Sequence, residues 1–311
     1  MGIAFSRLKA LDKAPCDIYL KLGDRKMLKM VNENDEINND FFAQMEDKGA
    51  TEMFLKKSEF SQFDDVFGKM LNAKLKSAKI SKVEKIQVMG SQLGFDYVHK
   101  QMQAIGISES TAKVAQSTVE NTLEVVMKDR NLFSALKEIL IGNSYISEHS
   151  IMAVTISTEI LRKLSWTGSG NVDKIAMAGL FHDNLVPDDR LARINRSSQL
   201  KALSNEEREI VLSHSDAAAR KLEESKFVDQ DVYNIVKNHH ERPQGEGFPG
   251  GMQAQALSNL TCIFILAEEI VELLYTYKFD VIKARKFWES DYEFFNTGNF
   301  KKPLDIAKSI L

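Results

Sequence analysis

The chain has few cysteines, no long hydrophobic run and no large excess of charge of either sign. Its 311 residues include two cysteines, Cys16 and Cys262, so a disulfide framework is excluded and free thiols in a reducing cytoplasm are expected. No run of 18 or more apolar residues occurs, and residues 1–6 lack the hydrophobic core of a signal peptide, so we expect no membrane span. The formal net charge of −3 gives no electrostatic reason to expect DNA or RNA as a partner.

Histidine is also scarce, but its distribution is uneven. Five of the six histidines lie in one stretch, and Asp183 directly follows the second of them: His149, His182, His214, His239 and His240. Imidazole suits zinc, copper, iron and nickel, whereas a carboxylate can bridge two ions, so this set favours a transition metal over calcium or magnesium. Neighbouring helical residues point about 100 degrees apart, which would let His182 hold one ion while Asp183 reaches a second. The pattern therefore predicts a polynuclear metal site.

Apolar helices surround several of these side chains. Apolar residues recur at helical spacing after His149 and before His182, so both rings are expected to point inward. A third apolar helix, from about residue 257 to 274, carries Glu268 and Glu269, and a buried acid is costly unless it is paired or bound to metal. One of these two glutamates is therefore a predicted ligand. The apolar register favours Glu268, with Glu269 as the alternative.

A loop rich in glycine and proline follows the last two histidines. Residues 239–251 run His-His-Glu-Arg-Pro-Gln-Gly-Glu-Gly-Phe-Pro-Gly-Gly, a composition that excludes helix and strand. Such a loop can form the wall of a pocket beside the two imidazoles. Within it, we interpret Glu241 and Arg242 as an ion pair that fixes the loop.

The order of these motifs resembles the HD-GYP family, a branch of the HD superfamily whose members hydrolyse cyclic di-GMP in bacteria. The resemblance covers roughly residues 136–280 and is most specific between His239 and Gly251. It implies an HD-type all-α helical bundle with two transition-metal ions, iron first and manganese or zinc as alternatives. By the resemblance one ion would be held by His149, His182, Asp183 and Glu268, and the other by Asp183, His214, His239 and His240. Asp183 would bridge the ions, and a metal-bridging water or hydroxide would attack the phosphodiester.

The chain departs from the family pattern where substrate phosphate is expected to bind. Members usually carry Ile-Gly-Lys after the His-Asp pair, whereas this chain has Asn184-Leu185-Val186 and so lacks the lysine. In the loop, the usual tyrosine is Phe248, which has no hydroxyl to donate. The substrate contacts that the resemblance still implies are Arg242, Gly245, Gly247, Phe248 and Lys278. Arg190, Arg193 and Arg196 are further cations that could restore the lost charge.

Two functions remain open on these residues. The first is a metal-dependent phosphodiesterase of cyclic di-GMP with an altered substrate site, which the complete ligand set favours, because a scaffold could have filled this core with apolar side chains. The alternative is a catalytically silent, metal-containing receptor for cyclic di-GMP, or a protein-interaction scaffold in signalling. The missing phosphate contacts favour it, since each charge-assisted contact is worth about 1.5–3 kcal/mol.

The chain is expected to have three parts: a small α+β module at residues 1–76, a helical connector at 77–135 and a metal-binding helical domain at 136–311. In the module, residues 17–22 and 25–31 predict a β-hairpin, residues 40–46 a helix and residues 51–55 a strand. We expect the module to be regulatory or to bind a signalling partner. A homodimer could form through the connector. The aromatic residues after position 282 are expected to close the bundle, with a dimer contact as the alternative: Phe287, Trp288, Phe294, Phe295 and Phe300.

Overall fold

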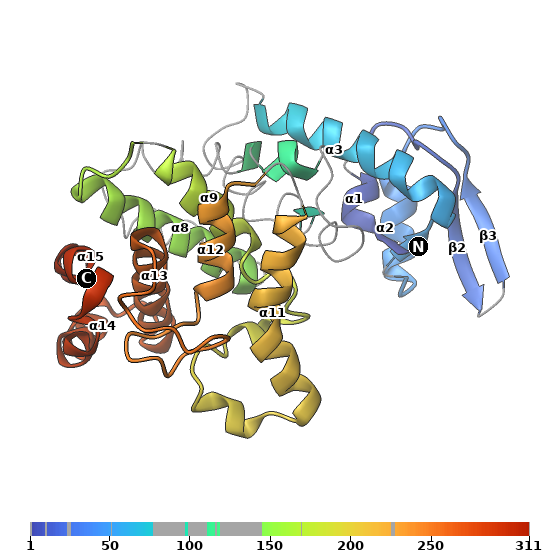
Figure 1. Cartoon of the computed structure of the whole chain (residues 1–311). Coiled ribbons are helices and arrows are strands. Elements are labelled where there is room, and N and C mark those ends of the chain that lie inside the picture. Colours follow the sequence, from blue (N-terminus) through green and yellow to red (C-terminus); the bar gives the residue numbers. More distant parts are fainter. Residues whose placement is uncertain are drawn as a thin grey trace. The chain divides into compact units, whose positions relative to one another are not determined.

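The computed structural model divides into two compact units, Met1–Ile80 and Ser81–Leu311 (Figure 1). It describes residues 2–9, 11–23, 26–50, 52–76, 97–98, 111–115, 117–118, 145–168, 170–224 and 228–310. The predicted connector, residues 77–135, lies almost entirely outside the described residues. The two units are therefore described separately.

The first unit is an antiparallel sheet with helices, which confirms the predicted α+β class. Its strands are β1 (Gly2–Ala4), β2 (Ile18–Gly23), β3 (Lys26–Val31) and β4 (Glu52–Phe54), in the order β1-β4-β2-β3. Its helices are α1 (Phe5–Lys9), α2 (Asn39–Asp47) and α3 (Phe60–Lys76), with a 3-10 turn at Lys57–Glu59. The predicted hairpin, helix and strand correspond to β2–β3, α2 and β4. Strand β1 and helices α1 and α3 are additional.

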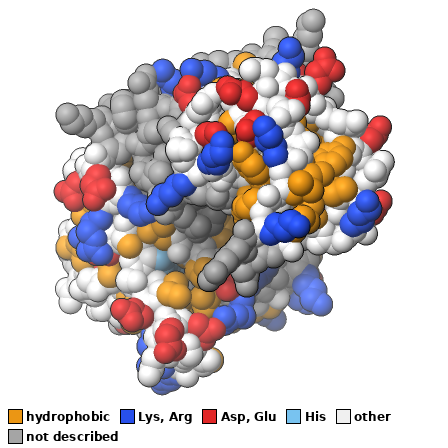
Figure 2. Space-filling model, turned by 90° about the vertical axis from the view of Figure 1, so that its right-hand side faces the viewer, with side chains coloured by type: hydrophobic (Ala, Val, Ile, Leu, Met, Phe, Trp, Pro, Cys, Tyr) orange, Lys and Arg blue, Asp and Glu red, His pale blue; other side chains and the backbone are white. Residues whose placement is uncertain are grey.

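The β2–β3 hairpin leaves apolar side chains in contact with solvent. Strand β3 is an edge of the sheet, and Leu22, Met27 and Leu28 are about half exposed. Figure 2, which views this side of the molecule, shows hydrophobic side chains gathered beside lysines and arginines. An exposed apolar edge fits the partner-binding role expected for the module, which stays a prediction.

The described part of the second unit consists of helices and loops, which confirms the predicted helical bundle. The long helices are α8 (Tyr145–Lys163), α9 (Asn171–Phe181), α11 (Asn205–Glu223), α12 (Gln230–Asn238), α13 (Asn259–Thr276) and α14 (Val281–Asp291). Shorter elements are α10 (Asp189–Ala192), α15 (Lys301–Lys308) and 3-10 turns at Gln199–Ala202, Tyr292–Phe295 and Gly298–Phe300. Helix α13 packs against α8, α12, α14 and α15. Because it is apolar almost all round, it occupies the centre of the bundle.

Local capping fixes where the helices begin. A capping box between Ser204 and Glu207 starts α11, and Ser258 caps α13. The Asp189 carboxylate accepts the backbone N–H groups of Tyr145 and Ile146, at 2.8 and 3.3 Å, and so closes the first turn of α8. These caps fix the start of the helices that carry His149, His214 and Glu268.

The C-terminal aromatic residues pack against the bundle in part. Trp288, Phe295 and Phe300 are buried, with 5.4 Å between the ring centroids of the last two. Phe287, in contrast, is 41% exposed. The predicted closure is therefore confirmed for these three rings, and Phe287 contacts the bundle through Tyr277, at 5.8 Å between ring centroids, while part of its side chain stays exposed. The homodimer alternative stays a prediction.

In the part of the chain that the structure describes, no helix is both long and apolar enough to span a bilayer.

Candidate metal centre

The five predicted histidines and Asp183 meet inside the second unit. Their potential ligand atoms form two groups in which all atoms lie within 4.8 Å of one another: Asp183 with His214, His239 and His240, and Asp183 with His149 and His182. Asp183 belongs to both groups. All six side chains are buried, so the cluster is shielded from bulk water.

Four helices bring these side chains together. His149 lies in the second turn of α8 and His214 in the middle of α11. His182 and His239 are the C-caps of α9 and α12, so each is followed directly by a second polar residue, Asp183 or His240, as the chain leaves the helix. Each of these two helix ends therefore places two polar side chains at the centre of the bundle.

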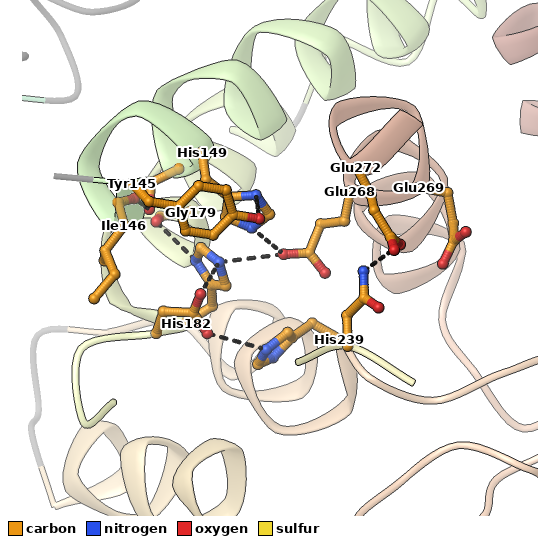
Figure 3. Close-up of polar contacts among 12 residues, drawn as sticks. Tyr145, Ile146, His149, Gly179, His182, His239, Glu268, Glu269 and Glu272 are labelled. Atoms are coloured by element: carbon orange, nitrogen blue, oxygen red, sulfur yellow. Dashed lines mark hydrogen bonds and ion pairs between the residues drawn. The ribbon is translucent and has the colours of Figure 1, made fainter. Parts of the chain in front are cut away.

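The structure separates the two glutamates that the sequence left as alternatives. Glu268 Oε1 lies 3.1 Å from His149 Nε2 and 3.2 Å from His182 Nε2 (Figure 3). The Glu269 carboxylate points away from the histidines and pairs with Arg242 at 2.7 Å and Arg196 at 2.5 Å. Glu268 is thus the acid of α13 that joins the cluster.

Hydrogen bonds to backbone carbonyls fix the tautomer of three histidines. The Nδ1 atoms of His182, His214 and His239 lie 2.9, 2.8 and 2.7 Å from the carbonyl oxygens of Gly179, Val211 and Val236. A carbonyl only accepts, so each Nδ1 carries a proton, and the lone pair of the neutral ring is on Nε2, which faces the cluster. Hydrogen bonds of this kind, made by the ring nitrogen that faces away from the ion, orient histidine ligands in metal sites.

Electrostatics hold the two acids in their charged form. Burial acts to raise the pKa of Asp183, but contacts with His182, His214 and His239 outweigh it and hold this pKa well below its usual range. Burial likewise opposes ionisation of Glu268, and His239, His149 and His182 lower its pKa. Burial and the neighbouring imidazoles lower the pKa of His240 well below normal, so this ring is neutral. Two carboxylates and neutral imidazole are ligands for a cation.

The two carboxylates also act on His182. Burial lowers its pKa, but Asp183 and Glu268 raise it well above the usual value. The cluster therefore attracts a positive charge at His182 Nε2. A metal ion would take the place of that proton, as in other sites where metal binding releases protons.

Two buried nitrogen atoms support the fit of a metal to this cluster. His240 Nδ1 has no hydrogen-bond partner among the described residues, and His182 Nε2 faces only the carboxylate oxygens of Asp183 and Glu268, at 3.3 and 3.2 Å. A buried polar group left without a partner costs about 1–3 kcal/mol and calls for an ion or water. Together with the histidine and carboxylate donor set, this shows that the residues present fit transition-metal ions.

The loop at residues 239–251 is fixed by bonds other than the predicted ion pair. The Glu241 carboxylate accepts the backbone N–H groups of Gly250 at 2.7 Å and Met252 at 2.8 Å. Arg242 donates to the Asn195 and Glu241 carbonyl oxygens and pairs with Glu269. Each residue thus has a structural role, but they do not pair with each other as predicted.

The predicted substrate contacts occupy very different positions. Arg242 is 5% exposed and both of its terminal nitrogens have partners, an arrangement that suits a structural residue better than a substrate contact. Phe248 is buried and stacks on His240, with 4.4 Å between ring centroids. Lys278 is exposed just after α13 in the left-handed conformation. Gly245 also has a positive φ, of 85 degrees.

Gly247 allows the loop to pack tightly against its own first residues. A Cβ at this position would lie 2.4 Å from the His240 carbonyl oxygen and 2.5 Å from the Arg242 nitrogen, both backbone atoms. We expect Gly247→Ala to destabilise the protein by about 1–3 kcal/mol, in the range found for overpacked sites. Chemical denaturation measures this change.

Gly168 provides the matched control for that measurement. A Cβ there meets nothing within 4 Å, so Gly168→Ala is expected to leave the free energy of unfolding nearly unchanged. Equal stability of the two variants would show that the loop does not require glycine at 247.

Three residues beside the cluster were not identified as a group from the sequence. Tyr145 Oη lies 3.3 Å from His149 Nδ1, and its ring packs on that imidazole at 5.1 Å between centroids. The Arg193 guanidinium lies 3.8 Å from the Tyr145 ring centroid and 5.3 Å from that of Tyr275. Tyr145 precedes His149 by four residues, so helical spacing could have indicated it. Tyr275 and Arg193 come from distant segments, which no local pattern connects.

Comparisons with known proteins agree with this geometry. Residues 146–271 match the family model described as HD domain. The cyclic di-GMP phosphodiesterase PA4108 of Pseudomonas aeruginosa is 26% identical over 149 residues, which cover 47% of this chain and 34% of that protein. The chain thus matches about a third of the length of this curated relative.

A solved structure shares the fold over the whole chain. Bd1817, a HDG"Y"P protein from Bdellovibrio bacteriovorus, superimposes with a TM-score of 0.62 and 19% sequence identity, covering 100% of this chain and 98% of that one. At this identity the likeness concerns the fold.

Proposed function

The chain carries an HD domain at residues 146–271 and resembles the HD-GYP branch, and from this we propose that it is a metal-dependent phosphodiesterase that hydrolyses cyclic di-GMP. The observation that carries the proposal is the shared Asp183, whose carboxylate belongs to both groups of potential ligands. A similar protein named as a cyclic di-GMP phosphodiesterase supports the choice of substrate.

In this proposal two ions are held in adjacent sites, iron first and manganese or zinc as alternatives. One set is His149, His182, Asp183 and Glu268, and the other is Asp183, His214, His239 and His240. When bound, such ions act as Lewis acids that activate water and neutralise charge on the phosphodiester. The Glu268 side chain belongs to the first set, and Glu269 is excluded from it by its pairing with two arginines.

The protein's own residues position the reaction. Three backbone carbonyls hold imidazole rings in one tautomer, and Tyr145 packs on His149. Phe248 covers one face of His240 and keeps water from it. Such supporting contacts commonly change metal affinity or activity by about 10–100-fold when removed.

Arg193 is the cation best placed to bind substrate phosphate. Arg190 pairs with Glu207 at the surface, and Arg196 pairs with Glu269 and Glu272. Arg193, in contrast, is exposed and stacks on Tyr145, which packs on His149. A cyclic dinucleotide that lies over the metal centre and extends past Tyr145 would meet this guanidinium.

Removal of the Arg193 charge is expected to weaken substrate binding. Arg193→Met keeps an apolar stem on Tyr145, and we expect it to raise the KM for cyclic di-GMP about tenfold or more while kcat changes little, because one charge-assisted contact is worth about 1.5–3 kcal/mol. Steady-state kinetics measure both constants. Arg190→Met, three residues earlier in the short helix α10 whose C-cap is Arg193, is the control, and an equal KM in both variants would remove Arg193 from the substrate site.

A direct test is hydrolysis of cyclic di-GMP by anaerobically purified protein loaded separately with iron, manganese or zinc. Formation of linear dinucleotide or GMP with at least one metal, and none after chelation, is the expected result. Binding of cyclic di-GMP without product would favour the alternative of a silent receptor. That alternative is supported by Val186, an apolar, buried side chain in the segment where the related family places its lysine.

The proposal also includes the compartment and the partners of the protein. Two free, buried cysteines suit a reducing cytoplasm. The exposed hairpin of the N-terminal module would bind a signalling protein partner, and the chain could act as a homodimer.

A further inference from the structure

A cavity separate from the histidine cluster lies against α13. Its volume is about 300 Å³, and it is lined by Arg196, Glu269, Leu273, Phe287, Trp288, Phe294 and Phe295. Glu268 and Glu269 are successive residues of α13, but Figure 3 shows Glu268 directed toward the histidines and Glu269 directed away from them. The same helix therefore serves the metal centre with one carboxylate and this cavity with the next.

The walls of the cavity are suited to a planar ring. Four of its seven lining residues are aromatic, from α14 and the 3-10 turn that follows. Trp288 and Phe295 pack at 6.0 Å between centroids, and Phe287 is 41% exposed at the rim. Aromatic side chains stack favourably on other rings, in addition to the area they bury.

Polar groups of the cavity are suited to an anion that accepts hydrogen bonds. The Trp288 side chain is 2% exposed, and its Nε1–H has no hydrogen-bond partner among the described residues. The Arg196 side chain is 39% exposed and lies 2.5 Å from Glu269 Oε2 and 3.7 Å from Glu272 Oε2. Because Glu269 also pairs with buried Arg242, it keeps a cationic partner if Arg196 turns toward a ligand.

Size limits the class of ligand. A volume of about 300 Å³ is at the lower end of the range for small-molecule pockets, roughly 300–1,000 Å³. It admits one ring system with one anionic group, whereas a cyclic dinucleotide carries two bases and two phosphates. The cavity is therefore unsuited to the substrate of the proposed phosphodiesterase.

We propose that this cavity is a second ligand site, which binds a planar aromatic anion no larger than a mononucleotide. The ring packs on the aromatic side chains that line the cavity, and Arg196 pairs with the anionic group. This inference is independent of the proposed function, because it involves neither the metal ions nor hydrolysis.

Tryptophan fluorescence tests the proposal with little ambiguity. The chain contains two tryptophans, Trp166 and Trp288, so Trp166→Phe leaves the cavity residue as the sole reporter. We expect guanosine 5′-monophosphate to change the Trp288 emission of the full chain saturably. Guanosine, which lacks the anionic group, and inorganic phosphate, which lacks the ring, are each expected to bind at least about tenfold more weakly.

Substitutions then place the ligand. Arg196→Gln in the same background is expected to weaken binding of guanosine 5′-monophosphate about tenfold, whereas Arg190→Gln, whose partner is Glu207, leaves it unchanged. Leu273→Phe, which narrows the cavity, is expected to weaken it as well. Thermal unfolding and metal content check that each variant is folded.

Three results would overturn the proposal. The first is no saturable change with guanosine 5′-monophosphate, and the second is equal binding of guanosine, which would exclude a role for the anion. The third is unchanged affinity in folded Arg196→Gln and Leu273→Phe, which would place the nucleotide elsewhere. Loss of hydrolysis at the metal centre has no bearing on any of the three, so the two proposals fail separately.

Discussion

Replacement of Asp183 by alanine is expected to release both metal ions and to lower hydrolysis of cyclic di-GMP by more than about 100-fold. The reason is that its carboxylate belongs to both ligand groups and lies 3.3 Å from His182 Nε2, 3.4 Å from His214 Nε2 and 3.6 Å from His239 Nε2. Loss of an outer contact alone commonly costs about 10–100-fold, so loss of a shared ligand should cost more. Elemental analysis and a product assay on the same sample measure both effects.

Asp216 supplies a matched control for this variant. It lies on α11, two residues after His214, and pairs with Arg220 and Lys237 at the surface rather than with the histidines. Asp216→Ala is therefore expected to keep the metal content and activity of the unmodified chain. If Asp183→Ala also kept two ions, the bridging assignment would be wrong.

Neutralisation of the two adjacent glutamates of α13 is expected to affect different properties. For Glu268 the main loss is in metal content, and for Glu269 it is in stability. Glu268→Gln removes an anion 3.1 Å from His149 Nε2 and 3.2 Å from His182 Nε2, so we expect it to lose the ion of that group with modest change in stability. Glu269→Gln removes the carboxylate that pairs with buried Arg242. We expect it to keep its metal but to lose about 3–5 kcal/mol of stability, the usual cost of breaking a buried ion pair.

Metal content and denaturant unfolding of both variants, with metal present throughout, separate these effects. Each glutamate serves as the control for the other, because the substitutions are identical in chemistry and adjacent in sequence. Loss of metal from Glu269→Gln with retention in Glu268→Gln would reverse the assignment made from the structure.

The cluster of histidines and carboxylates was largely predictable because its residues have strong local signals. His149 lies on an apolar helical face, and His182-Asp183 and His239-His240 are adjacent pairs at helix ends, where two polar side chains can enter one site. The choice between Glu268 and Glu269 was harder. Arg196 and Arg242, which bind Glu269, come from two other segments, so the pairing depends on how the helices pack.

The substrate side was predicted less well, for the same reason. The resemblance placed Arg242 among the substrate contacts, but Glu269 and two carbonyl oxygens hold it inside the protein. Arg193 could be named only as one of three arginines. Its position over Tyr145 results from the packing of α10 against α8, which no spacing within the chain encodes.

In the N-terminal unit, local sequence patterns predicted some of the strands and helices and missed others. The β2–β3 hairpin was predicted from alternation around a turn, whereas β1 has three residues and pairs with β4 about fifty positions later. Helix α3 was missed although its pattern was present. Phe60, Phe63, Phe67 and Leu71 recur at helical spacing, and all four are buried.

Two ions held in one cluster are the basis of the proposed function, and the metal content of the unmodified chain tests this most directly. The measurement is elemental analysis of anaerobically purified protein, with protein concentration from amino-acid analysis. We predict a content of two transition-metal ions per chain, which a chelator removes and added metal restores. No bound metal, or no more than one ion after saturation with iron, manganese or zinc, would contradict it.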